Sequence, residues 1–357
     1  MRQRLLSERL SAPLLFLFAA MLLFAAGCGR DDHAAPAGPS QAPDAEGDLV
    51  VYSGRHERMV QPLIERFTET TGIKVTLLSG KSAALLRKLE LEAGRGEADV
   101  FLSNDISVLA LGGDRALFRP LPAAVAESVE PDYRGPNDTW VGLSGRLRVL
   151  VVNTAAIDAA RVNSIWQLAD PIWDNQLAIT SASNGSFIGG VTAYLAASGE
   201  TRVREWLNGL KSRANGEAYA KHSAIVRDVA AGAKQIGLVN HYYVFRHLDS
   251  EPDAPIRLVY PDQSDGAMGA AWNAAGGAIS AMCKRCRKAE AFMAFLTSNE
   301  GQRLFADVNH EYPLSRDVPA GPELPPRSSI KLLDVPLVEL GRQRNQAIAL
   351  IEQVGLP

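Results

Sequence analysis

The sequence predicts an α/β protein made of two doubly wound lobes joined by a hinge, in the mature part of an exported chain. Short apolar runs alternate with amphipathic stretches of helical period, which is typical of a parallel sheet covered by helices. This series occurs twice along the 357 residues, a length that suggests about two domains of roughly 150 residues. The first residues have the pattern of an export signal.

The composition is that of an ordinary folded protein. Apolar residues make up 46% of the chain and charged residues 22%, with a formal net charge of −3. These values exclude a disordered chain, a collagen and a multi-span membrane protein. The near-neutral balance gives no electrostatic reason to expect a nucleic acid as partner. Three cysteines are too few for a disulfide-stapled scaffold.

The N-terminus predicts a lipoprotein signal over residues 1–27. Met1–Leu10 carries three arginines, and Ala12–Ala26 is apolar and uncharged but too short to span a hydrocarbon core of ~30 Å. The small residues directly before Cys28 resemble a bacterial lipobox, in which the cysteine is lipidated; ordinary signal-peptidase cleavage is the alternative. Residues 28–47, rich in Ala, Pro and Gly, predict a flexible tether. We therefore expect a periplasmic protein that meets the membrane only through a lipid anchor.

The first α/β series directly follows this tether. In order, it predicts a strand at Leu49–Tyr52, a helix through Val60 and Phe67 that ends before Gly72, a strand at Ile73–Leu77, a helix at Ala83–Glu92, a strand at Asp99–Leu102 and a helix up to Ala116. This β-α-β-α-β order is that of a parallel sheet with helices on both faces.

The second series begins at a strong strand run, Leu147–Val152. It continues with a strand at Leu177–Ile179, helices near Ile188–Ala197, Arg202–Leu210 and Ser223–Ala231, a strand at Gln235–Val239, a return strand at Gly276–Ser280 and a helix at Lys288–Leu296. Two such lobes in an exported chain suggest a hinged ligand trap.

Polar side chains follow three of the predicted strands. His56 comes four residues after Tyr52, Asn104 and Asp105 follow the third strand, and Tyr242 and Tyr243 come shortly after Val239. Ligands of open α/β sheets bind beyond the carboxyl ends of the strands. We therefore expect these residues at the mouth of a ligand cleft.

Two tyrosines and a histidine suit a ferric ion, a hard cation that prefers anionic oxygen. A phenol is normally neutral at pH 7, with a pKa of about 10, but a bound trivalent metal favours the phenolate. Each residue also has a plainer interpretation: His56 as a surface residue, and the adjacent Tyr242 and Tyr243 as one core and one surface residue. Adjacent side chains point to opposite faces of a strand, so the tyrosines could converge only in a loop.

Cys283 and Cys286 are separated by two residues, and the export signal indicates an oxidising compartment. The simplest interpretation is a local disulfide, or two free thiols without a chemical role, before a helix. A thioredoxin-like redox role is a less favoured alternative, and zinc would need two further ligands that do not stand nearby in the sequence.

From Asp48 to Leu356 the chain resembles the periplasmic ferric-ion-binding proteins of bacterial iron ABC importers, of the type-II periplasmic-binding-protein superfamily. The resemblance rests on seven short segments in this order: Val51-Tyr52-Ser53-Gly54-Arg55-His56, Ala98-Asp99-Val100-Phe101, Leu143-Ser144-Gly145-Arg146, Tyr219-Ala220-Lys221, Asn240-His241-Tyr242-Tyr243, Glu300-Gly301-Gln302-Arg303 and Glu311-Tyr312-Pro313-Leu314. It implies that His56, Tyr242 and Tyr243 occupy metal-ligand positions.

The resemblance also implies a synergistic anion, carbonate or phosphate, at a helix start formed by Asn184, Gly185 and Ser186. Backbone N–H groups there bind anions whatever the side chains are. Asn240 matches a supporting amide, and His222 stands where the family often has Asn. A second departure is Asn104, which replaces a frequent Glu ligand, so Asn104 and its neighbour Asp105 are possible metal or outer-shell residues.

These expectations combine into a monomeric receptor without catalytic turnover that delivers ferric iron to an inner-membrane ABC permease. The expected lobes are residues 48–146 with 273–318, and residues 147–272 with 319–357. One alternative is a receptor for a small organic anion, a phosphonate or a thiamine-like ligand. A hydrolase or transferase is disfavoured, because the sequence has no nucleophile elbow, Walker loop or His-Glu-x-x-His motif.

Overall fold

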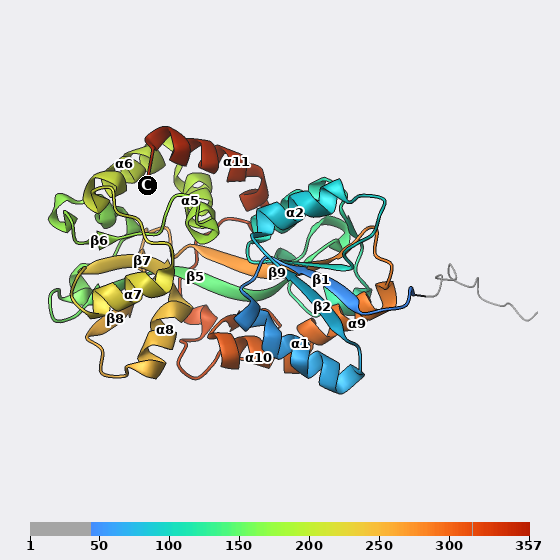
Figure 1. Cartoon of the computed structure of the whole chain (residues 1–357). Helices are drawn as coiled ribbons and strands as arrows, with labels where there is room; N and C mark the ends of the chain where they lie inside the picture. Colours follow the sequence, from blue (N-terminus) through green and yellow to red (C-terminus); the bar gives the residue numbers. More distant parts are fainter. Residues whose placement is uncertain (1–43, 316) are drawn as a thin grey trace, which may run out of the picture. The chain divides into compact units, whose positions relative to one another are not determined.

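A twisted sheet runs through the body of the protein, with helices packed on it (Figure 1). The computed structural model describes residues 44–315 and 317–357. The predicted signal, the lipidation site at Cys28 and most of the predicted tether lie outside the described residues. The strands are β1 (Leu49–Ser53), β2 (Val75–Ser79), β3 (Val100–Ser103), β4 (Phe118–Arg119), β5 (Val141–Asn153), β6 (Leu177–Ala178), β7 (Ile236–Asn240), β8 (Ile256–Val259), β9 (Trp272–Ser280) and β10 (Tyr312–Pro313).

The α-helices agree with the predicted alternation and add elements that periodicity did not single out. They are α1 (Glu57–Thr71), α2 (Ser82–Leu91), α3 (Ile106–Asp114), α4 (Ala123–Ala126), α5 (Gly185–Ser198), α6 (Glu200–Ala214), α7 (His222–Ala230), α8 (His241–Ser250), α9 (Cys286–Thr297), α10 (Asn299–Asn309) and α11 (Leu337–Val354). Among the described residues, no helix is long and apolar enough to cross a membrane.

The first half of the sheet is parallel, as the β-α-β-α-β order predicts. Strand β1 pairs in parallel with β2 on one side and with β3 on the other. Helix α1 buries Val60, Ile64 and Phe67 at helical spacing, and it ends at Gly72, whose φ of 73° is the left-handed conformation that glycine adopts most easily.

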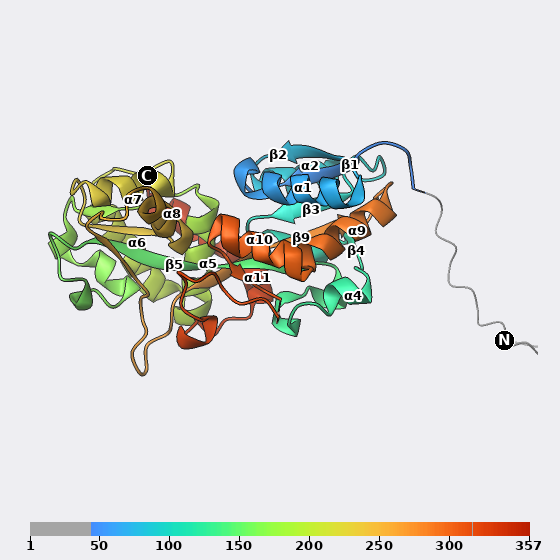
Figure 2. The ribbon, with the colours of Figure 1, turned by 90° about the horizontal axis from the view of Figure 1, so that it is seen from below.

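Two long strands, β5 and β9, connect the halves of the sheet. The sheet order is β2-β1-β3-β9-β5-β7-β6, and β9 runs antiparallel to both β3 and β5. The first part of β5 pairs with β9, and the second part pairs with β7 and β8. Figure 2 shows β5 and β9 from below, between the helices of the two halves.

The C-terminal helix α11 packs against α3, which follows β3, and also against α5 and α6 of the second series. It therefore contacts helices from both predicted lobes, and Figure 1 shows it as the red helix beside α5 and α6. The lobe boundaries given above stay a prediction.

Candidate metal and anion site

A cleft of about 760 Å³ opens at the carboxyl ends of β1 and β3. Its lining comes from both α/β series. From the first series it includes His56, Lys81, Asn104 and Asp105; from the second, Asn184, Gly185, Ser186, His222 and Tyr243; and from the C-terminal helix, Arg344 and Ile348. The structure therefore brings most of the sequence-predicted site residues to one cleft.

His56 is the exposed residue that precedes α1 on the cleft wall. It occupies the N-cap position in an extended conformation, and its side chain makes no capping hydrogen bond. The imidazole is therefore not engaged in ending the helix, and it is available to a ligand in the cleft.

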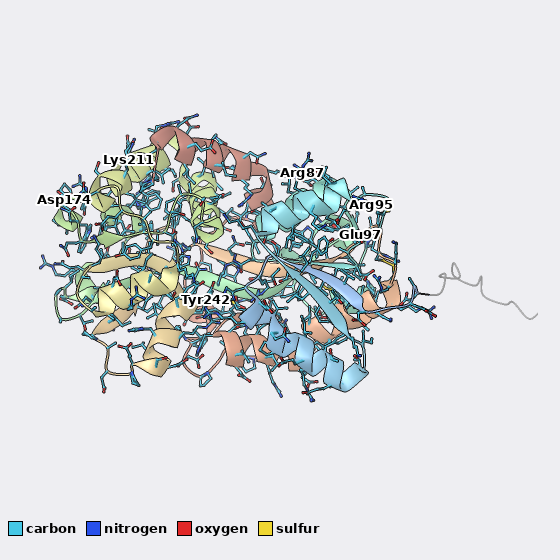
Figure 3. The ribbon with its side chains drawn as sticks, in the orientation of Figure 1. Arg87, Arg95, Glu97, Asp174, Lys211 and Tyr242 are labelled. Atoms are coloured by element: carbon cyan, nitrogen blue, oxygen red, sulfur yellow. A yellow bond between two sulfur atoms is a disulfide. The ribbon has the colours of Figure 1, made fainter. Side chains whose placement is uncertain are left out.

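Tyr242 and Tyr243 lie in the first turn of α8, not in a loop. Helix α8 begins directly after β7, so the two residues leave the strand before alternation would send them to opposite faces. Their ring centroids are 4.5 Å apart. Tyr243 lines the cleft, whereas Tyr242 is 2% exposed and lies behind it, near the middle of the body (Figure 3).

The tyrosine pair sits among cationic side chains. The neighbouring phenol of Tyr242, followed by burial, raises the pKa of Tyr243, while Arg58 and Arg246 act in the opposite direction. The guanidinium of Arg246 lies 5.3 Å from the centroid of the Tyr242 ring. Two phenols this close resist a second ionisation unless a cation compensates, and that is what a bound metal provides.

Asn240 connects the tyrosines to the start of α5. Its Nδ2 donates to the Tyr242 hydroxyl at 3.0 Å and to Ser186 Oγ at 3.2 Å. At the same helix start, Asn184 Oδ1 accepts from the backbone N–H groups of Ser186 and Phe187. The Asn184 side chain thus satisfies two first-turn N–H groups of a 14-residue helix whose first residues line the cleft.

Asn104 and Asp105 differ in how far their side chains are engaged. Asp105 caps α3 through Ser107, accepts from Asn273 at 3.0 Å and pairs with Arg344 at 2.8 Å. Asp105 is 4% exposed, and its carboxylate is already paired with a cation. The described contacts of Asn104 are made by its backbone, so its amide is the freer of the two toward a ligand.

His222 lies against Tyr243, with ring centroids 4.9 Å apart, and is 3% exposed. Burial, with Arg148 and Arg146 nearby, lowers the pKa of His222 well below its ordinary value, so the ring is neutral at pH 7. Within the described residues neither ring nitrogen has a hydrogen-bond partner of ordinary geometry. A neutral imidazole can still donate one hydrogen bond to a ligand in the cleft.

His241 has a structural place beside the site. Its Nδ1 accepts from Leu147 N–H at 3.2 Å, which puts the ring proton on Nε2, where it donates to the His310 carbonyl at 2.7 Å. Burial lowers the pKa of His241 to about 3. The ring therefore fastens the start of α8 to β5 as a neutral side chain.

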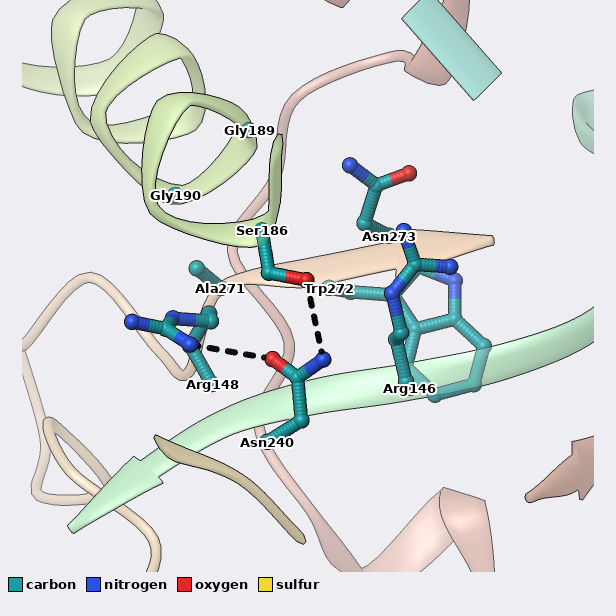
Figure 4. Close-up of a pocket in the computed structure, with 9 residues that line it drawn as sticks. All are labelled: Arg146, Arg148, Ser186, Gly189, Gly190, Asn240, Ala271, Trp272 and Asn273. Atoms are coloured by element: carbon teal, nitrogen blue, oxygen red, sulfur yellow. Dashed lines mark hydrogen bonds between the residues drawn. The ribbon is translucent and has the colours of Figure 1, made fainter. Parts of the chain in front are cut away.

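Arg146 and Arg148 lie beside these residues, although the sequence reasoning gave neither of them a role in the site. Both lie on β5, 3% and 5% exposed, and line a small pocket with Ser186 and Asn240 (Figure 4). The sequence does contain a signal for them, because these two arginines interrupt an apolar run that is otherwise typical of a fully buried strand.

Cys283 and Cys286 form a disulfide at the start of α9. In the part of the chain that the structure describes, no group of three His, Cys, Asp or Glu side chains could hold a metal ion.

Comparison with known proteins places the chain in a family. Residues 62–327 match the family described as bacterial extracellular solute-binding protein, and the chain belongs to it. A Serratia marcescens protein named Fe(3+)-binding periplasmic protein is 33% identical over 322 residues, which covers 89% of this chain and 93% of the relative. The resemblance predicted from the sequence is thereby confirmed.

Solved structures agree with this assignment. Iron-bound HitA from Pseudomonas aeruginosa is 28% identical with a TM-score of 0.81, covering 87% of this chain and all of that one. A Trichodesmium FutA structure with iron and citrate is 27% identical with a TM-score of 0.76, covering 87% and 100%. The predicted α/β fold class is confirmed, and these relatives are transport proteins, not enzymes.

Proposed function

We propose that the protein is a ferric-iron receptor of a bacterial uptake system that holds the metal with a co-bound anion in the cleft. The observation that carries this proposal is the tyrosine pair. Tyr243 lines the cleft and Tyr242 lies behind it, while His56 stands on the wall formed by the first series. Relatives named for ferric-iron binding support the same assignment.

The donor set explains why an anion is needed. Two phenolates and a neutral imidazole leave a ferric ion with one uncompensated positive charge and open coordination positions. Asn184, Gly185 and Ser186 offer a helix start to an anion, with His222 in the same cleft lining and Asn240 hydrogen-bonded to Ser186 Oγ. Carbonate, phosphate and citrate all have suitable oxygens; citrate accompanies iron in the Trichodesmium relative.

The transport cycle follows from the placement of the ligands on two lobes. The metal and anion bridge the lobes and stabilise a closed form by binding it better than the open form. An ABC permease of the inner membrane then recognises the closed monomer. The lipid anchor on Cys28 would hold the receptor at a membrane.

Metal analysis with a visible spectrum tests the proposal. Protein purified without chelators should contain iron, or take it up one to one, and should show the charge-transfer colour of Fe(III) bound to tyrosinate. A colourless protein that does not bind iron with carbonate, phosphate or citrate present would contradict it.

A second candidate is a receptor for a small organic anion alone. The neutral amide at Asn104 and the cationic surroundings of the tyrosines favour it. Such a receptor would bind its anion equally well with and without ferric ion, and it would stay colourless.

A further inference from the structure

We propose that three consecutive residues, Asn309–Glu311, are a positioning element of the iron site. They fix His56 on one wall of the cleft relative to the tyrosine pair. None of the three lines the cleft. The inference rests on the proposed function, because it explains how that ligand set keeps its geometry. The segment leads from the end of α10 into β10, and β10 pairs with β5 at Gly145 and Ser144.

Glu311 holds the connection that carries His56. Its carboxylate accepts from Arg55 Nη2 at 2.5 Å. The Ser144 hydroxyl accepts from Arg55 Nη1 at 3.0 Å and donates to the same carboxylate oxygen at 2.9 Å. All three side chains are buried. Because Arg55 directly precedes His56 between β1 and α1, this ion pair fixes the backbone from which the imidazole projects.

The same connection is held from its other side by the start of α2. A Cβ on Gly54 would lie 1.9 Å from Ser82 Oγ, so the backbone packs directly on this helix start. The Ser82 hydroxyl in turn accepts from the backbone N–H of Asn104 at 3.1 Å. His56 itself is exposed and makes no capping hydrogen bond. Its position is therefore set by its neighbours.

Asn309 links the start of α1 to α8. Its Nδ2 donates to the carbonyl of Met59, in the first turn of α1, at 3.0 Å. Its Oδ1 accepts from Arg246 Nη2, on α8, also at 3.0 Å. Asn309 is 1% exposed. One buried amide therefore contacts both the helix that follows His56 and the arginine that packs on the Tyr242 ring.

His310 makes the third link, and it contacts both ends of α8. Its carbonyl accepts from Nε2 of His241, the first residue of α8, at 2.7 Å. Its own Nε2 lies 2.8 Å from a carboxylate oxygen of Asp249, near the other end of the helix. Since His241 directly precedes Tyr242, the main-chain contact fixes the turn from which the phenols project.

These contacts join the two proposed ligand groups. The segment belongs to the first predicted lobe, whereas α8 belongs to the second. Glu311 is connected to His56 through one ion pair and one peptide bond, and the His310 carbonyl is connected to Tyr242 through one hydrogen bond and one peptide bond. The separation of the imidazole from the phenols is therefore set before the metal arrives. Ligands held in place in advance bind more tightly, because less freedom is lost on binding.

A double-mutant cycle tests this positioning role. Arg55→Met should weaken ferric binding about tenfold, at the lower end of what outer-shell changes cost. In a His56→Ala background the same change should have little effect, because the imidazole that Arg55 positions is then absent. The tyrosinate–iron band should remain in all of these variants, since the phenols are kept. Absorbance titration with ferric citrate, in competition with a chelator, measures the affinities.

Ser144→Ala is a second, milder variant in case Arg55→Met does not fold. It removes one hydroxyl from the cluster and keeps the ion pair, so it should weaken ferric binding by a smaller factor, again only when His56 is present. Arg285→Met is the matched control, because it also breaks an arginine pair with a buried carboxylate, that of Asp99. Asp99 precedes β3, at the end away from the cleft, so Arg285→Met should lower the stability to urea without changing ferric affinity.

The outcomes separate the two proposals. An equal loss of affinity with and without His56, a similar loss in Arg285→Met, or wild-type affinity in both Arg55→Met and Ser144→Ala would overturn the positioning role. The ferric function would then stand, because the wild type would still show the tyrosinate–iron band. A wild type with neither this band nor ferric binding would overturn the ferric function and the positioning role together.

Discussion

At the scale of single residues, the proposed metal site depends on two phenol oxygens. Tyr242→Phe and Tyr243→Phe should each weaken ferric binding by more than the ~10–100-fold that outer-shell changes cost, because each removes an anionic ligand. The visible band should shift or disappear. Absorbance titration with ferric citrate measures both effects.

Tyr133→Phe is the control for this pair, since the Tyr133 hydroxyl accepts from Arg327 and Tyr133 does not line the cleft. It should titrate like the wild type. Wild-type titrations in both Tyr242→Phe and Tyr243→Phe would remove the proposed metal site.

Asn104 is the residue whose side chain departs from the expected ligand set. Asn104→Glu should strengthen ferric binding tenfold or more, because opposite unit charges ~4 Å apart attract by several kcal/mol at an effective dielectric constant of ~20. Asn208→Glu, at an exposed position of α6, controls for the added charge. Competition with a chelator measures the change, and a loss of affinity would mean that this loop faces away from the metal.

At the scale of elements, the junction of β7 and α8 is held by neutral His241. Between about pH 3 and the ordinary histidine pKa of about 6.5, the unfolded chain binds a proton at this position and the folded chain does not. Stability should therefore fall as the pH drops below 6.5, by up to about 1.4 kcal/mol per unit. His222 contributes with the same sign.

Urea unfolding of the metal-free protein from pH 7.5 to 4.5 measures this slope. His241→Gln should be less stable at pH 7.5, because it loses the contacts with Leu147 and His310, but it should have a flatter pH dependence. Equal slopes of unfolding free energy against pH for the wild type and His241→Gln would contradict the assignment of this pH dependence to His241.

The sequence predicts the elements better than it predicts their junctions. The order of β1, α1, β2, α2 and β3 follows from apolar periodicity and the stop at Gly72. Periodicity does not indicate that α8 begins directly at His241, because a strand followed at once by a helix leaves no turn signature. Helix α11 also went unnoticed, since its buried face spans contacts with α3 and α5 that only the folded chain brings together.

The same limit applies to the site. His56 and Tyr243 were predicted from their places after strands, a rule of open α/β sheets, whereas the start of α5 was expected only from the resemblance to ferric-ion-binding proteins. The place of Arg148 was not, because it depends on Asn240 directly across the ladder and on two buried guanidinium nitrogens that have no hydrogen-bond partner among the described residues. Both facts depend on register and burial, and a single sequence specifies neither.

At the scale of the whole molecule, α11 is joined to α3 by the buried pair of Arg344 and Asp105. Arg344→Met should lower the free energy of unfolding by about 3–5 kcal/mol, because it leaves a buried carboxylate without its cation. Urea unfolding at pH 7.5 measures the loss. The double variant Arg344→Met with Asp105→Asn should recover part of it, and a double variant less stable than the single one would contradict the pairing.

The continuity of β5 has a mechanical consequence. β5 is one strand that pairs first with β9, with a register shift between Gly142 and Ser144, and then with β7 and β8, so any opening of the proposed lobes has to flex a hydrogen-bonded ribbon rather than a loop. A hydrogen-bonded ribbon of strands bends easily out of its own plane, but it resists shear within that plane. We therefore expect the two lobes to rotate about a single axis and to return to the same alignment each time they close. The ligand would then meet a binding site of the same shape in every transport cycle.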